Sequence, residues 1–274
     1  MDTDLPSFTT PDLFSLLGSP SAPTILDVRR AKAFDDDTRL IPGALRRLPE
    51  TVDTWAASIS RDRRVIAYCV HGHEVSQAVT RRLRERGVDA QFLSGGITGW
   101  KESGAPTMTK RPDFGIPGEN PSRWVTRERP RIDRIACPWL IHRFIDPTAT
   151  FLYVPTAQVF DVARSENAVA YDIPGAPIEH DGPNCSFDSM LRAFDLHDAG
   201  LDQLAAIVRG ADTDRLGLTP QSAGLVAMSI GLSRLHADDQ ALREQGMLLY
   251  DALYAWIRVG QGERHNWQPE AMRA

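Results

Sequence analysis

The sequence is poor in cysteine, and its few cysteines are widely spaced. Cys69, Cys137 and Cys185 are the three thiols in 274 residues, and no two of them form a CxxC pair. An odd number of distant cysteines argues against a disulfide framework and is typical of a reducing compartment. The spacing also disfavours a closed structural zinc site, so any metal ligation has to depend mainly on histidine and carboxylate side chains.

Long hydrophobic runs and a strong charge of one sign are also absent. No stretch approaches the about 20 apolar residues that a membrane-spanning helix needs, and the N-terminal residues MDTDLPSFTT lack the apolar core of a secretory signal. A net charge of −5 gives the chain as a whole no electrostatic footprint for nucleic acid. We therefore expect a cytoplasmic protein that binds neither membranes nor nucleic acid, and we expect no nucleotide cofactor.

The length of 274 residues favours two domains, each large enough for its own core. In the first half, short apolar strands alternate with helices, which predicts a mostly parallel α/β sheet with helices on both faces. The second half predicts a helix-rich α+β domain. Residues 105–123 contain four prolines and two glycines and favour a semi-extended connection. We predict a first domain at 1–108, a linker at 109–123, a second domain at 124–260 and a loose tail at 261–274.

The first half is organised around residues 65–87. Val65–Tyr68 is a short apolar run typical of a buried strand, and a helical period begins at Val75 and ends before Gly87, a C-terminal cap. Cys69 therefore lies at a strand-to-helix turn. Loop amides and the positive end of the helix dipole stabilise a thiolate there, which predicts a nucleophile. A buried structural thiol is the alternative, but the polar, glycine-containing loop favours a thiol exposed to chemistry.

Four motifs in order over residues 5–108 resemble a rhodanese domain: Leu26–Arg29, Ile41–Ala44, Tyr68–Cys69 with its loop, and Ser94–Trp100 followed by Gly104–Pro106. In that family the loop cysteine accepts a sulfane sulfur as a persulfide and passes it to a nucleophile. The resemblance implies that Cys69 is the catalytic nucleophile. It also implies that the loop residues form the cradle for the substrate: Val70, His71, Gly72, His73, Glu74 and Val75.

The loop departs from the family pattern at Glu74. Rhodaneses that use thiosulfate commonly carry arginine five residues after the cysteine, whereas a carboxylate there repels a thiolate and a dianionic donor. Either His71 and His73 supply the positive charge, or the donor is a less charged persulfide. We expect a small sulfur donor and a thiol or anionic acceptor. Two alternatives are that the histidines are solvated loop residues, or that they ligate a metal together with Cys69.

Potential ligands in the second half concentrate in the loop IPGAPIEHDGPNCS and the helix that follows it. His180, Cys185 and Asp188 converge if the loop folds back, and Asp133 is placed to complete a site. Mixed histidine, carboxylate and thiolate ligation suits iron or zinc with an open coordination position. The alternative is that the acids and His180 are present for solubility and that Cys185 anchors the start of the helix.

A second resemblance covers most of residues 123–258 and is to the C-terminal domain of the bacterial chromate-resistance proteins. It rests on these motifs: Trp124–Arg127, Asp133–Ile141 with Arg143–Asp146, His180–Phe187, Gly210–Asp214 and Asp251–Ala255. Members of that family accompany chromate transporters, which implies chromate or a related oxyanion as a partner. Some members bear a different N-terminal region implicated in transcriptional control, and a DNA-binding role attached to that region is not inherited here.

Two functions follow from these patterns. The first is a sulfurtransferase-type enzyme in which Cys69 cycles between thiolate and persulfide, coupled to a metal- or oxyanion-binding domain in chromate or oxyanion resistance. The second is a metal or oxyanion sensor on a rhodanese scaffold. In this reading Glu74 marks a rhodanese fold that no longer transfers sulfur.

Overall fold

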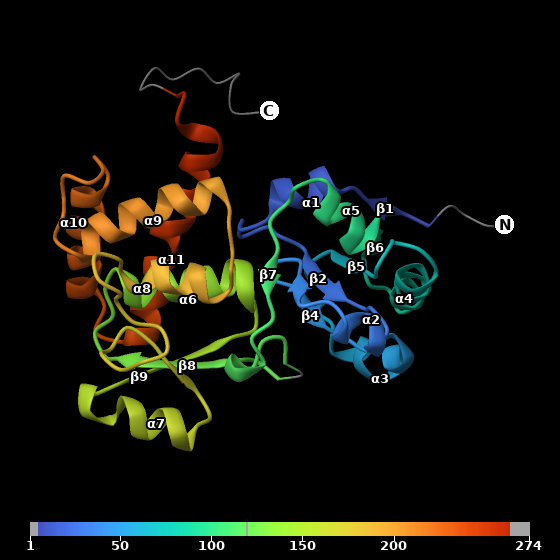
Figure 1. The fold of residues 1–274 in the computed structure, drawn as a ribbon, viewed down its shortest axis with the longest axis horizontal. Coiled ribbons are helices and arrows are strands. Elements are labelled where there is room, and N and C mark those ends of the chain that lie inside the picture. Colours follow the sequence, from blue (N-terminus) through green and yellow to red (C-terminus); the bar gives the residue numbers. More distant parts are fainter. Residues whose placement is uncertain (1–4, 119, 264–274) are drawn as a thin grey trace.

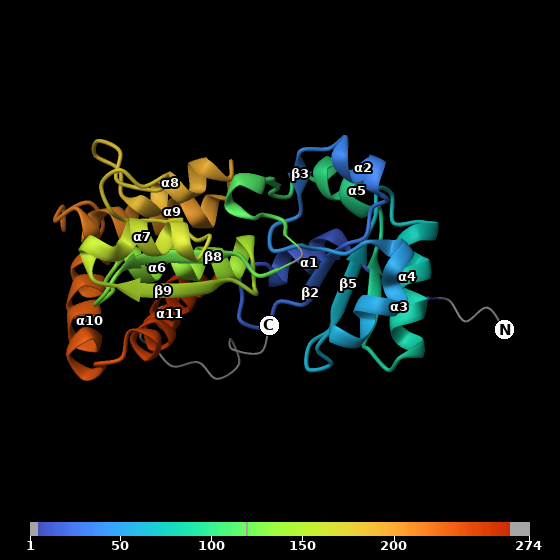
Figure 2. The ribbon, with the colours of Figure 1, turned by 90° about the horizontal axis from the view of Figure 1, so that it is seen from below.

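The computed structural model describes residues 5–118 and 120–263, which form two α/β units lying side by side (Figures 1 and 2). The first unit contains β1 (Ser7–Phe8), α1 (Thr10–Leu16), β2 (Thr24–Asp27), α2 (Ala31–Asp35), β3 (Arg39–Leu40), β4 (Leu45–Arg46), α3 (Val52–Trp55), β5 (Val65–Tyr68), α4 (Glu74–Glu85), β6 (Ala90–Leu93), α5 (Gly96–Glu102) and β7 (Met108–Thr109).

The main sheet of the first unit has five strands in the order β1-β6-β5-β2-β4, and every pairing is parallel. Side chains alternate between its two faces, as the two-residue period of a strand requires. Ile25 and Ile66 pack toward α1 and α5, whereas Leu26 and Ala67 pack toward α3 and α4. The predicted parallel sheet with helices on both faces is therefore confirmed.

The second unit has three parallel strands in the order β10-β8-β9, which alternate with α6 and α7 along the chain and are followed by a run of helices, so the predicted helix-rich second half is confirmed. Its elements are β8 (Arg123–Arg127), α6 (Asp133–Leu140), β9 (Thr150–Val154), α7 (Val159–Ser165), β10 (Val169–Ala170), α8 (Ser186–Ala193), α9 (Ala199–Asp212), α10 (Ser222–Leu235) and α11 (Asp239–Ala255).

Pro138 lies in the second turn of α6, inside the helix and not at its start. A proline there has no N–H to donate to the carbonyl of Arg134, which would leave that oxygen without its helical partner. The hydroxyls of Tyr153 and Tyr171 donate to the Arg134 carbonyl instead, each at 3.4 Å. The helix therefore tolerates the proline because two tyrosines from the neighbouring sheet layer replace its missing hydrogen bond.

The two units share a continuous hydrophobic core. The face of the first sheet covered by α1 and α5 merges with an aromatic cluster of the second unit, in which Trp139 lies 5.7 Å from Phe144 between ring centroids. The amide of Gly43 donates to the Phe144 carbonyl at 2.6 Å across the junction. Arg258, after α11, donates to the carbonyl of Leu17 at 3.2 Å.

The segment predicted as a linker is packed between the two units. Phe114 is buried between Trp124 and Phe194, at centroid distances of 5.8 and 6.0 Å. Arg111 lies over the Phe114 ring and donates to the carbonyl of Ala193 at 2.8 Å. The prolines shape the path of this segment, but its buried aromatic side chain makes it part of the core.

None of the helices in the described ranges combines the length and the apolar character that crossing a bilayer requires. The tail predicted to be loose lies largely outside the described residues, because residues 264–274 are among those not described.

Candidate functional site

Cys69 directly follows the carboxyl end of β5, the central strand of the first sheet. The residue before it, Tyr68, is fully buried, and its hydroxyl donates to the carboxylate of Asp27 at 2.9 Å. Asp27 in turn pairs with the fully buried guanidinium of Arg29 at 2.6 Å. This buried network holds the ends of β2 and β5 together, at the edge where ligands of parallel sheets bind.

The loop after Cys69 packs against the first turn of α5. The amides of Ile97 and Thr98 each donate at 3.0 Å, to the carbonyls of Cys69 and Val70 respectively. Gly72 has φ +72°, and a Cβ there would overlap the Leu93 carbonyl and lie 2.9 Å from the amide nitrogen of Gly95. Glycine is required at this position for both its conformation and its size.

The amides of this loop are not used by the fold. From Val70 to Val75 no backbone N–H has a hydrogen-bond acceptor among the residues described. Helix α4 begins at Glu74, and His73 at its N-cap position makes no side-chain capping bond. A loop of unpaired amides and the start of a 12-residue helix therefore follow the carboxyl end of β5, a combination suited to an anion.

The thiol of Cys69 is more enclosed than the polar loop predicts, since only 6% of the residue is exposed. Cys69 follows a fully buried strand, and the Ser76 hydroxyl in the first turn of α4 lies 3.2 Å from its sulfur. Ser76 also donates to the His73 carbonyl at 3.2 Å. By contrast His71, His73 and Glu74 are exposed, and the two imidazole rings lie 5.9 Å apart between centroids.

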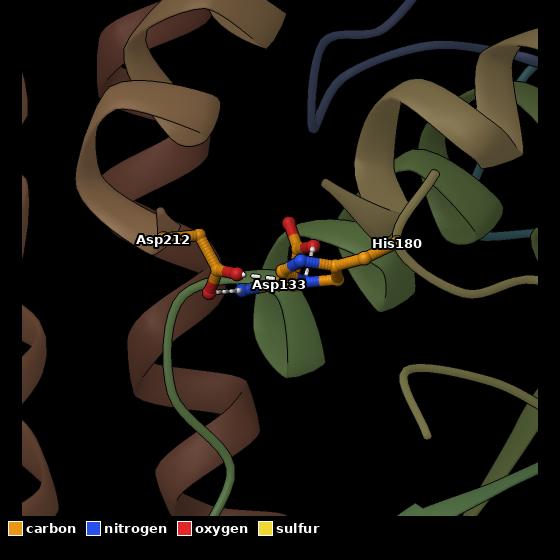
Figure 3. A group of neighbouring side chains, drawn as sticks. All are labelled: Asp133, His180 and Asp212. Carbon is orange, nitrogen blue, oxygen red and sulfur yellow. Dashed lines mark hydrogen bonds and ion pairs between the residues drawn. The ribbon is translucent and has the colours of Figure 1, made fainter. Parts of the chain in front are cut away.

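A second polar site lies beyond the carboxyl ends of the parallel strands in the second unit. Asp133 is the first residue of α6, which follows β8, and Asp172 and His180 belong to the loop after β10. Asp212 is the last residue of α9. Figure 3 shows Asp133, His180 and Asp212 converging from three separate segments.

One ring nitrogen, His180 Nε2, is at the centre of this cluster. It lies 3.0 Å from Asp212 Oδ2, 3.5 Å from Asp133 Oδ2 and 3.5 Å from Asp172 Oδ1. The Asp133 side chain is completely buried and that of Asp212 is 17% exposed, whereas the His180 side chain is 43% exposed. The imidazole therefore closes the cluster on the side that faces solvent.

The protonation of the cluster follows from its crowding. Hydrogen bonds to Asp133 and Asp172 raise the pKa of His180 to about 10. Burial, together with the charges of Asp133 and Asp172, raises the pKa of Asp212 to about 7. Burial also raises the pKa of Asp133. Three carboxyl groups in one place require a positive charge among them, and the His180 imidazolium is the nearest one the chain supplies.

Asp172 has partners of its own. Arg127 Nη2 donates to Asp172 Oδ2 at 3.0 Å, and Arg134 Nε lies 3.3 Å from the same oxygen. Burial alone would raise the pKa of Asp172, but hydrogen bonds from His180 and Ser186 and the two guanidinium charges lower it. Asp172 is therefore held ionised, and its charge is largely balanced by arginine.

The structure brings together only two of the four residues predicted to hold a metal. His180 and Asp133 meet, but Asp188 turns to Arg209, which binds both of its oxygens at 2.9 Å. Cys185 is fully buried at the N-cap of α8, and its sulfur lies 3.4 Å from Asp188 Oδ2. Burial and neighbouring carboxylates raise the pKa of the Cys185 thiol. These two residues form a capping box at the start of α8, the local role that competes with ligation.

Sequence reasoning missed Asp212 and Asp172 as members of the cluster. Asp172 ends an apolar run and Asp212 lies in the motif Gly210–Asp214, so both were visible, but their convergence depends on the packing of α9 against α6 and α8. A further signal is conformational: Ile132, before Asp133, has φ +41°, and Asp172 has φ +53°. Positive φ at non-glycine residues stores strain and clusters at functional sites.

The fold and the two sites define a protein that joins a loop-cysteine α/β unit to a helix-rich unit with a carboxylate–histidine cluster. Comparison with known families assigns both units. The model of the rhodanese-like domain matches residues 10–103, and that of the ChrB C-terminal domain matches residues 124–257. The chain thus carries a rhodanese-like domain followed by a ChrB C-terminal domain, as its two sequence resemblances predict.

The chain is similar to Protein ChrB of Cupriavidus metallidurans, with 38% identity over 149 residues. This match covers 51% of the chain and 43% of that relative, so the chain spans less than half of the relative's length. Among solved structures it is similar to a rhodanese-related protein from Thermoplasma volcanium (26% identity, 37% of this chain, 96% of that chain, TM-score 0.33). A rhodanese-like domain protein from Staphylococcus aureus is also similar (26% identity, 35% of this chain, 91% of that chain, TM-score 0.32).

Proposed function

We propose that this chain is a sulfurtransferase-type enzyme in which Cys69 carries a sulfane sulfur as a persulfide, and that it acts in chromate or oxyanion resistance. The observation that carries the proposal is the set of unpaired amides from Val70 to Val75, in the loop that directly follows Cys69. Such donors stabilise a thiolate and, after transfer, the terminal sulfur of a persulfide anion. The two domain matches are consistent with a chromate-resistance-associated protein.

The transfer needs no external oxidant or reductant. The Cys69 thiolate attacks the outer sulfur of a donor persulfide, a new S–S bond forms at Cys69, and the donor leaves as a thiolate. An acceptor thiolate then attacks the outer sulfur of the Cys69 persulfide, which restores the Cys69 thiolate. Since Ser76 has one hydroxyl proton, it has to release the His73 carbonyl in order to donate to the ionised sulfur.

The loop supports a singly charged donor better than thiosulfate. Glu74 is exposed at the first turn of α4, where its carboxylate adds negative charge to the loop that contains the unpaired amides. His71 and His73 are the neighbouring side chains that become cationic near neutral pH. A low-molecular-weight persulfide brings less negative charge than thiosulfate and meets less repulsion.

The test is mass spectrometry of the intact full-length chain after incubation with cysteine persulfide, a singly charged donor, or with thiosulfate. We expect a sulfur adduct on Cys69 that forms at least about tenfold faster with the persulfide, since tenfold corresponds to about 1.4 kcal/mol of repulsion. Cys69→Ser has to lose the adduct, while Cys137→Ala has to keep it, because Cys137 is fully buried and burial raises its pKa.

A binding or sensor function without sulfur transfer is the second candidate, and the 6% exposure of Cys69 favours it. In that case Cys69 is a buried structural residue, and the loop that follows it binds no sulfur donor. Absence of a Cys69 adduct with both donors, in protein whose three thiols all react after denaturation, would replace the enzyme proposal with this one.

A further inference from the structure

The second site contains a buried oxygen that the fold leaves without a partner. Asp133 is fully buried, and its Oδ2 accepts the amide of Ser186 at 2.5 Å. Its other oxygen, Oδ1, has no hydrogen-bond partner, and it is the one buried carboxylate oxygen of this kind among the described residues. Leaving such an oxygen unsatisfied costs about 1–3 kcal/mol or more for a charged group, so it points to a missing ligand.

The spacing of the donor atoms fits a cation. A cation bound at about 2.0–2.2 Å holds neighbouring ligand atoms about 2.8–3.6 Å apart in octahedral or tetrahedral geometry. His180 Nε2 lies 3.0 Å from Asp212 Oδ2 and 3.5 Å from Asp133 Oδ2. One donor atom from each of the three residues lies within 4.8 Å of the other two. The side chains therefore need only small adjustments to surround an ion, and His180 Nε2 releases the proton that it shares with the carboxylates when the ion binds.

The chemistry of the donors selects a class of metal. One imidazole nitrogen with carboxylate oxygens suits first-row divalent cations, whereas Cu(I) requires thiolate or thioether ligands. The converging donor atoms belong to Asp133, His180 and Asp212, and the Cys185 sulfur is not among them. An imidazole ligand also distinguishes the site from the all-oxygen cages that Ca²⁺ and Mg²⁺ prefer.

We propose that Asp133, His180 and Asp212 bind one first-row divalent cation, with Mn²⁺ and Zn²⁺ as its representatives, and that this site is separate from the chemistry at Cys69. Asp172 orients the cluster from outside, because its Oδ2 is engaged by Arg127 and Arg134. Three protein ligands leave coordination positions of the ion for water or for an exogenous ligand. The site therefore has the open position of a reactive metal centre.

The experiment is a Mn²⁺ titration of the full-length, EDTA-treated chain, followed by the loss of the free-ion EPR signal and then by displacement with Zn²⁺. We expect one saturable Mn²⁺ per chain. Asp212→Asn and His180→Gln should each weaken binding by more than the about 10–100-fold that loss of an outer-shell partner costs. Far-UV circular dichroism confirms the fold, and the half-exposed His180 is the safer of the two positions to change.

Two control variants test whether Mn²⁺ binds at this site and not at another histidine or at the Cys185 thiol. His197→Gln removes an imidazole whose side chain is 77% exposed, and Cys185→Ser removes the thiol while retaining a good N-cap. Both should bind Mn²⁺ within about twofold of the unmodified chain, a difference of only about 0.4 kcal/mol. The proposal is overturned by absence of saturable Mn²⁺ or Zn²⁺ binding, by full binding in folded Asp212→Asn, or by loss confined to Cys185→Ser.

Discussion

Gly18 of the rhodanese-like domain lies directly against the ring of Phe144 in the ChrB C-terminal domain. A Cβ at position 18 would overlap that ring and lie 2.7 Å from Tyr254 Cε1. Because Phe144 and Tyr254 are themselves packed at a centroid distance of 5.5 Å, the ring has little room to move away. The two domains are therefore fitted to each other at this glycine.

Gly18→Ala tests how tightly the domains are coupled. Gly18 has φ +78°, so alanine adds the strain of a left-handed backbone, about 1–2 kcal/mol, as well as overpacking of about 1–3 kcal/mol. Gly87→Ala is the matched control, since Gly87 has φ +77° and nothing within 4 Å of a Cβ. In urea unfolding we expect Gly18→Ala to be clearly less stable than Gly87→Ala. Equal free energies of unfolding would mean that the domains do not pack on each other as described.

Gly72→Ala tests the loop around Cys69. Alanine there adds the same left-handed strain and also meets the Leu93 carbonyl and the Gly95 amide, so the loop has to move. Gly104→Ala is the control, with φ +75° and open space around its Cβ. We expect Gly72→Ala to form the Cys69 persulfide at least about tenfold more slowly, about 1.4 kcal/mol in the barrier, while Gly104→Ala matches the unmodified chain. Normal persulfide formation in Gly72→Ala would show that loop geometry does not support the reaction.

The lowered pKa of His142 predicts that the free energy of unfolding falls in acid. Burial and the neighbouring Arg243 lower the pKa of His142 to about 4. The neutral ring accepts from Arg243 Nη1 at 3.1 Å through Nε2, and its Nδ1 lies 3.3 Å from the Pro147 carbonyl. Between its unfolded pKa of about 6.5 and its folded pKa the unfolded chain binds the extra proton. Stability from this residue is thus present above about pH 6.5 and falls, by about 3 kcal/mol at most, as the pH drops toward 4.

His142→Gln checks this window, because glutamine keeps a donor and an acceptor but does not titrate. Urea unfolding of both proteins at pH 7 and at pH 4.5 should show a smaller loss for the glutamine variant. Identical losses in the two proteins would assign the acid sensitivity to other groups, such as the carboxylates paired elsewhere in the fold.

The sequence by itself determined the features that depend on local periodicity. The run Val65–Tyr68 predicted a buried strand, the helical spacing before Gly87 predicted α4, and together they placed Cys69 at the turn between them. Both the parallel sheet and the helix-rich second half follow from such patterns. Their physical origin is the same, because strand and helix repeats are encoded in neighbouring residues.

Only the tertiary structure decided which side chains meet and which are covered. Asp212 reaches the amide of Asp133 across 79 positions of sequence because α9 packs on α6 and α8, and no local repeat records that contact. Cys185 and Asp188 do not join the predicted metal site, because they form the capping box at the start of α8 and Asp188 also pairs with Arg209. The enclosure of Cys69 likewise depends on packing around β5 and on Ser76. Residue types and local spacing allow several pairings of these side chains, and the packing of distant helices and strands decides which pairing forms.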